Sequence, residues 1–91
     1  MSSKRRGKLE IIHDMLSSIQ NKGGQIKPTH LLYKSNLSHS KMKEYLEELI
    51  QKGMVKEVYE KDKKMFVITD KGREFLMEFE RIREFSESFG L

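Results

Sequence analysis

The sequence contains no cysteine, which excludes a disulfide scaffold, a thiol nucleophile and any cysteine-based zinc site. It also has no apolar run near the roughly 18 to 20 residues that a membrane-spanning helix needs. The basic start, residues 1–6, is not followed by the hydrophobic stretch of a signal peptide. We therefore expect a cytoplasmic protein with no membrane partner.

Motifs for catalysis and for metal binding are missing as well. The three histidines, His13, His30 and His39, include no pair at the i, i+3 or i+4 spacing of metal ligands on a helix. There is no nucleophile elbow, no glycine-rich loop that opens a helix after a strand, and no carboxylate pair in an apolar setting. We expect neither an enzyme nor a bound metal or cofactor, and no small-molecule substrate is evident.

The charge is distributed unevenly along a chain that is long enough for one domain. The 91 residues carry 18 Lys and Arg against 14 Asp and Glu, a net charge of +4. Residues 1–43 hold nine basic and two acidic groups, which gives this half +7. Such a basic half predicts a polyanionic partner, although a solvated surface of uneven charge would give the same totals.

Periodic apolar residues predict two helices in the first part of the chain. From Leu9 to Ile19 they recur at the spacing of one helical face. The glycines at 23–24 end this helix, since glycine accepts the left-handed conformation of a C-terminal cap. After a short extended segment, Pro28 starts a second, short helix for which Thr29 is a possible N-cap.

A third helix is predicted from Ser38, a good N-cap, to about Lys52, before Gly53. One face of this helix carries the apolar residues Met42, Leu46, Leu49 and Ile50. Two short helices joined by the tight turn before Ser38 are typical of a helix-turn-helix.

Two β-prone runs follow, at 55–59 and 65–69, and the charged residues 60–64 between them predict a hairpin with a charged tip. Phe66 and Ile68 alternate along the second run and should face the core.

A last helix is predicted from Lys71 to about Ser88. The order of helix, short strand, two helices, hairpin and helix is that of an α+β winged helix-turn-helix. We predict a single domain over residues 1–91, divided into a basic arm (1–8), a winged helix (9–70) and a C-terminal helix (71–89).

Several segments together resemble one family. They are Arg6-Gly-Lys-Leu-Glu-Ile-Ile, Thr29-His-Leu-Leu-Tyr-Lys, Leu37-Ser38, Tyr45-Leu-Glu-Glu-Leu-Ile-Gln-Lys-Gly-Met-Val and Phe66-Val-Ile-Thr-Asp-Lys-Gly72. Their order resembles the archaeal winged-helix family that includes small, basic chromosomal DNA-binding proteins of about 10 kDa. The resemblance implies a protein that binds duplex DNA and, in several relatives, a homodimer formed by the last helix.

The recognition element would be the helix at 38–52, with the hairpin at 55–69 as the wing. Base edges and phosphates are expected to meet the first turns of such a helix, and wing, arm and second helix to hold phosphates. The predicted DNA-binding residues are Arg5, Arg6, Lys27, Thr29, Lys34, Ser38, His39, Ser40, Lys41, Lys43, Lys61, Lys63 and Lys64. Such a protein would be a transcriptional regulator or a chromatin-like, nucleoid-associated architectural protein.

The last helix carries a heptad seam of apolar residues that a single winged helix cannot bury completely. The predicted dimer interface consists of Phe75, Phe79, Ile82, Phe85, Ser86 and Phe89. A frayed tail after Ile82 is the plain alternative for this seam. The alternative function is a winged-helix module that binds another protein through this Phe-rich helix, which the acidic residues Glu44, Glu47 and Glu48 would favour.

Overall fold

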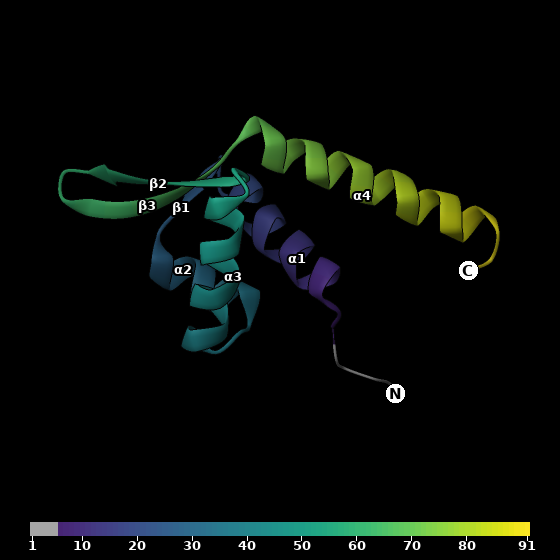
Figure 1. Ribbon diagram of the computed structural model, residues 1–91, viewed down its shortest axis with the longest axis horizontal. Helices are drawn as coiled ribbons and strands as arrows, with labels where there is room; N and C mark the ends of the chain where they lie inside the picture. The colour runs from purple at the N-terminus through teal and green to yellow at the C-terminus, as the bar shows by residue number, and fades with distance from the viewer. Residues whose placement is uncertain (1–5) are drawn as a thin grey trace.

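The computed structural model describes residues 6–91 and confirms the predicted order of elements (Figure 1). The elements are α1 (Lys8–Asn21), β1 (Gln25–Ile26), α2 (Pro28–Ser35), α3 (His39–Gln51), β2 (Val55–Glu60), β3 (Lys63–Ile68) and α4 (Asp70–Ser88). The strands form one antiparallel sheet in the order β1-β3-β2. In Figure 1 the β2–β3 hairpin projects to one side of the helices and α4 to the other. Within residues 6–91, every helix is too short or too polar to span a bilayer.

The core lies between α1, α2, α3 and one face of the sheet. The fully buried apolar side chains include Met15, Leu16, Ile19, Ile26, Leu31, Leu49, Val55 and Ile68. Phe66 and Ile68 both face this core, as their alternation in the sequence predicts. Most of the burial therefore comes from the periodic apolar faces that the sequence displays.

The first turn of α1 differs from the prediction. Leu9 belongs to the predicted apolar face, but 59% of it is exposed to solvent. Burial along α1 begins at Ile12, and Leu9, almost one turn earlier, lies outside the core cluster. Leu9 instead lines a hollow between α1 and the distal half of α4.

The start of α2 also corrects an expectation. Lys27, and not Thr29, is the N-cap, and Pro28 is the first helical residue. Proline suits this position because its missing N–H would have no partner inside the helix and its φ is already helical. Thr29 is consequently within the first turn, with its side chain exposed.

The wing has longer strands and a tighter tip than the sequence predicts. Glu60 pairs with Lys63, so the loop is only Lys61 and Asp62. Both loop residues have positive φ, 51° and 66°, as a type I′ turn requires. The right-handed twist of the two strands favours this turn, and the strands therefore extend into the region expected as a loop.

The start of α4 is fixed to the end of α3 through Thr69. Its hydroxyl donates to the Gly53 carbonyl at 2.6 Å and accepts from the Gly72 amide at 3.2 Å. Gly72 is buried at this joint, and a Cβ there would lie 2.5 Å from the Met54 carbonyl oxygen and 2.7 Å from Ile68 Cγ1. Only glycine therefore allows α4 to approach the strand ends this closely.

We predict that Gly72→Ala destabilises the fold by about 1 to 3 kcal/mol. The added methyl group would collide with the carbonyl oxygen of Met54, which is part of the backbone and cannot move aside. In an unhindered helix the same change would stabilise by about 0.4 to 1 kcal/mol, so the sign of the effect tests the contact. Urea unfolding of both proteins measures it. Glu74→Ala, an exposed change on the same helix, should stay within about 0.5 kcal/mol of the parent.

Candidate nucleic-acid interface

The N-terminus of α3 is an exposed, well-capped helix start. Asn36 takes the left-handed conformation (φ 56°, ψ 41°) that turns the chain out of α2, and asparagine tolerates it. The Ser38 hydroxyl then accepts a hydrogen bond from the Lys41 amide at 3.2 Å. The cap confirms the predicted start of the helix. The Ser38 hydroxyl satisfies the Lys41 amide, and the positive end of the helix dipole faces solvent.

The side chains of this first turn and the next are mostly exposed. Among them are the predicted DNA-binding residues Ser38, His39, Ser40, Lys41 and Lys43. The Lys41 ammonium lies 3.4 Å from Glu44, with both side chains largely in solvent, so this ion pair is weak. Within residues 6–91, Lys43 makes no ion pair. The structure thus places these five residues together at one end of the helix.

Acidic residues follow along α3, but one of them is already paired. The Lys8 ammonium of α1 lies 2.8 Å from Glu48, and the hydrogen bond and charge of Glu48 raise the pKa of Lys8. Glu44 is near Lys41, and Glu47 is exposed. The acidic cluster that would favour a protein partner is therefore partly neutralised by the protein itself.

The wing presents its lysines on and beside the two-residue turn. Lys61 is in the turn, and Lys63 and Lys64 are the first residues of β3. Lys64 lies 3.6 Å from Glu57, whose carboxylate also accepts a hydrogen bond from the Tyr59 hydroxyl. For Lys61 and Lys63, the described part of the chain supplies no ionic partner.

The predicted N-terminal arm is only partly represented in the structure. Arg5 lies outside the described residues. Arg6 faces the fold, because its guanidinium pairs with Asp14 at 2.7 Å and donates to the Ser35 carbonyl at 2.9 Å. Gly7 is the N-cap of α1, so Lys8 belongs to the helix. Arg6 therefore connects the start of α1 to the end of α2.

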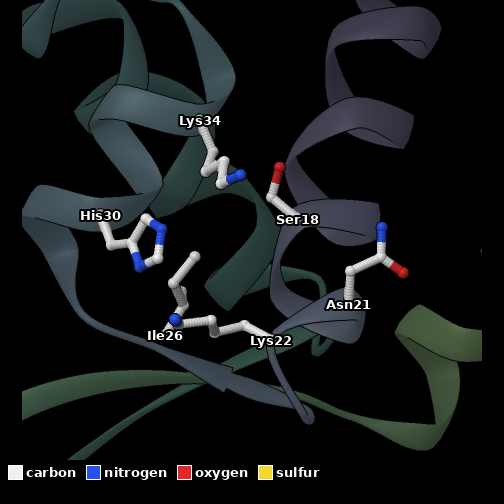
Figure 2. A pocket seen from close by; sticks show the side chains of 6 residues that line it. All are labelled: Ser18, Asn21, Lys22, Ile26, His30 and Lys34. Atoms are coloured by element: carbon white, nitrogen blue, oxygen red, sulfur yellow. The ribbon is translucent and has the colours of Figure 1, made fainter.

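The basic residues at and within α2 point in two different directions. Lys27 and Thr29 are exposed at its start. Lys34 instead points toward α1, as does His30 one turn earlier, and both line a pocket with Lys22 (Figure 2). Burial and then the charges of Lys22, Lys34 and Lys27 lower the pKa of His30. Lys22, at the end of α1, was missed by sequence reasoning, since only the fold brings it to α2.

The distal half of α4 leaves apolar side chains in solvent. Phe75 and Phe79 are partly buried, and the Phe79 ring stacks on His13 of α1 with ring centres 4.3 Å apart. Beyond them Ile82, Phe85 and Phe89 are each about two thirds exposed, at 65%, 66% and 67%. Leu9, Phe79, Ile82, Ser86 and Leu91 are among the residues around a hollow of about 500 Å³ between α1 and α4. We call the exposed residues Ile82, Phe85, Phe89 and Leu91, at and just beyond the end of this helix, the apolar end of α4.

His13 is held between the two helices. Its Nε2 lies 3.2 Å from Glu80 of α4, and its Nδ1 lies 3.4 Å from Asp14. Glu80 also pairs with Arg83, and that hydrogen bond is the main reason why its pKa is lowered. No group of three or more possible metal ligands occurs within residues 6–91. These contacts set the direction in which α4 leaves the core.

Solved structures of small proteins are similar to this chain. The DNA-binding protein Sso10a-2 from Sulfolobus solfataricus is 25% identical, with a TM-score of 0.79 over 92% of this chain and 85% of that one. SSV1 F-93 is 25% identical, with a TM-score of 0.69 over 97% and 99% of the two chains. F93 from STIV, described as a winged-helix DNA-binding protein, shares the fold at 15% identity, with a TM-score of 0.70 over 88% and 92%.

No protein among those with curated functions matches the sequence. A family model described as winged helix-turn-helix, however, matches residues 5–87, which is nearly the whole chain. The capped α3, the short α2 before it and the hairpin after it are the elements that define this arrangement. The chain belongs to the winged helix-turn-helix family.

Proposed function

We propose that this protein binds duplex DNA as a homodimer, with the N-terminal turns of α3 in the major groove. The observation that carries the proposal is the exposed start of α3, where Ser40, Lys41 and Lys43 surround a free helix N-terminus. A helix fits the major groove, and unpaired amides with lysines beside them attract phosphate. The described similarity to a Sulfolobus DNA-binding protein supports the same function.

The wing and the start of α2 extend the same basic surface. Lys61 and Lys63 would reach phosphates beside the groove, while Lys27 and Thr29 would contact the backbone next to α3. Lysine is a hydrated point charge, so these contacts add affinity without reading sequence. Arg6 is engaged within the fold and is not needed for this surface.

Sequence preference should be weak to moderate. The exposed start of α3 offers His39 and Ser40 as base readers, but no arginine, asparagine or glutamine precedes Gln51 on this helix. Those three residue types make the strongest bidentate contacts with bases. The protein therefore fits either an architectural role on many sequences or a regulator with modest discrimination. Membership of the winged-helix family also confirms the prediction that it is not an enzyme.

The proposed dimer forms through the apolar end of α4. A second copy would cover Ile82, Phe85 and Phe89. Ile82 and Phe89 continue the heptad spacing of the partly buried Phe79 and Ser86, and Phe85 flanks this seam. Burying such a patch is favourable at roughly 25 cal/mol per Å² of apolar surface. Two linked recognition helices would also bind DNA more tightly, because the second contact becomes intramolecular.

The salt dependence of DNA binding tests how many phosphates the protein contacts. Fluorescence anisotropy with a random 30-base-pair duplex should give an affinity that falls by about 10³ to 10⁵ between 50 and 200 mM salt if roughly 6 to 10 phosphates are contacted. Lys41→Ala with Lys43→Ala should weaken binding on all sequences and reduce the salt slope by about one unit per lost contact.

The matched control is Lys52→Ala with Lys71→Ala, which removes two exposed lysines far from the start of α3. Lys52 is the C-cap of α3, and Lys71, in the first turn of α4, donates to the Lys52 carbonyl at 2.7 Å. This pair should leave the slope near that of the parent. If both double variants give the same salt slope, the start of α3 does not contact DNA.

The mass of the protein in solution tests the proposed dimer. Sedimentation equilibrium should give the mass of two chains for the parent and of one chain for Phe85→Asp, because a buried carboxylate at the seam is strongly unfavourable. Met77→Asp is the control, since Met77 is 61% exposed on α4 but lies away from the seam. A monomeric parent would contradict the homodimer and leave the apolar end to a different protein, the alternative function.

A further inference from the structure

A pocket between the end of α1 and α2 is lined only by basic and neutral residues. It has a volume of about 200 Å³ and is formed by Ser18, Asn21, Lys22, Ile26, His30 and Lys34. In Figure 2 the Lys34 side chain extends toward Ser18, and the Lys22 side chain extends toward the His30 ring. Three positively charged or protonatable groups from two helices thus converge on one small space.

The positive charge continues on the other side of His30. A second hollow, of about 310 Å³, shares Lys22, Ile26 and His30 with the first and adds Gln25, Lys27 and Met65. Neither hollow is lined by an Asp or a Glu. Among the contacts of residues 6–91, Lys22, Lys27 and Lys34 have no ion pair. This cluster therefore lacks the carboxylates that neutralise the basic groups of α1 and α4.

Burial and this uncompensated charge act together on the His30 imidazole. Its pKa is lowered, first by burial and then by Lys22, Lys34 and Lys27. Residues that line either hollow come from α1, β1, α2 and β3, and the titratable ones facing His30 are these three lysines alone. Each like charge within a few ångströms disfavours the imidazolium, and an anion in the pocket would remove this penalty.

The hydrogen-bond donors that line the pocket determine which kind of anion fits it. The Ser18 hydroxyl donates to the Asp14 carbonyl at 2.8 Å, so its hydrogen is already used. The remaining donors that face the pocket are two ammonium groups and the His30 ring, while the Asn21 amide is turned away from them in Figure 2. No arginine lines the pocket to provide the planar fork that pairs with a carboxylate or a phosphate, so its donors are point charges, and lysine commonly binds phosphate in this way. Point-charge donors around a small volume suit one compact, tetrahedral oxyanion.

We propose that this pocket binds a single phosphate group, held by Lys22, His30 and Lys34. The phosphate has two possible sources, a phosphodiester of the DNA backbone or a free phosphate ion. The first source rests on the proposed DNA binding, and the second does not. In both cases the bound anion favours protonated His30, so phosphate raises the pKa of this histidine toward its ordinary range.

The test follows the imidazole signals of the full-length protein by NMR. Inorganic phosphate is titrated near pH 6.5 against sodium chloride of equal ionic strength. Phosphate should shift the His30 signals saturably and raise the pKa of His30, whereas chloride should not. The His13 ring, held between Asp14 and Glu80, serves as the internal reference.

Variants identify the ligands of the phosphate. Lys22→Gln and Lys34→Gln should each weaken phosphate binding by about tenfold, the loss expected for one charged hydrogen bond. Lys52→Gln removes the same charge at the exposed end of α3, away from either hollow, and should have no effect. If all three variants respond alike, or phosphate and chloride act alike, free phosphate does not bind here.

A second titration with duplex DNA distinguishes the two sources. Shifts of the His30 signals that the duplex causes in the parent, and that Lys22→Gln and Lys34→Gln abolish, would identify a backbone phosphate. His39, at the start of α3, reports DNA binding independently. If DNA shifts the signals of neither His30 nor His39, the proposed function is contradicted. The phosphate titration then still tests whether the pocket binds phosphate. A His30 ring that responds to neither ligand overturns the phosphate site.

Discussion

The burial of one face of α1 is the constraint on which the rest of the structure depends. Met15, Leu16 and Ile19 are completely buried, and α2, β1, β3 and α4 all pack against this helix. Because all these elements share one partner, the position of each is fixed relative to the others. The helix α3 is held in turn by α2 and β2. The start of α3, the wing and the apolar end of α4 therefore lie at defined places on a small domain (Figure 1). A loss of packing at α1 would disturb all three surfaces together.

The elements and the core could be predicted from the sequence because they depend on local periodicity. The face of α3 and the alternation of Phe66 and Ile68 are such cases. The loop of the wing could not be predicted well, since the pairing of Glu60 with Lys63 decides where the strands end. The exposure of Leu9 depends on where the core stops, which is a tertiary property.

At the candidate site, too, local features could be predicted from the sequence and tertiary contacts could not. The basic residues at the start of α3 follow a cap that is visible in the sequence, so their common location was predictable. Arg6 was expected in an arm, but Asp14 and the Ser35 carbonyl hold it against the fold. Lys22 joins His30 and Lys34 only because α1 and α2 pack side by side. Contacts between distant segments therefore account for what sequence reasoning did not find.

The proposed DNA-binding surface consists of the start of α3 and the tip of the wing. Amide chemical-shift changes on titration of the labelled protein with a duplex map that surface residue by residue. The largest changes should fall at residues 38–43 and 61–63, with small changes along the distal half of α4. Changes confined to α4, or spread evenly over the basic residues of the chain, would contradict the proposed surface.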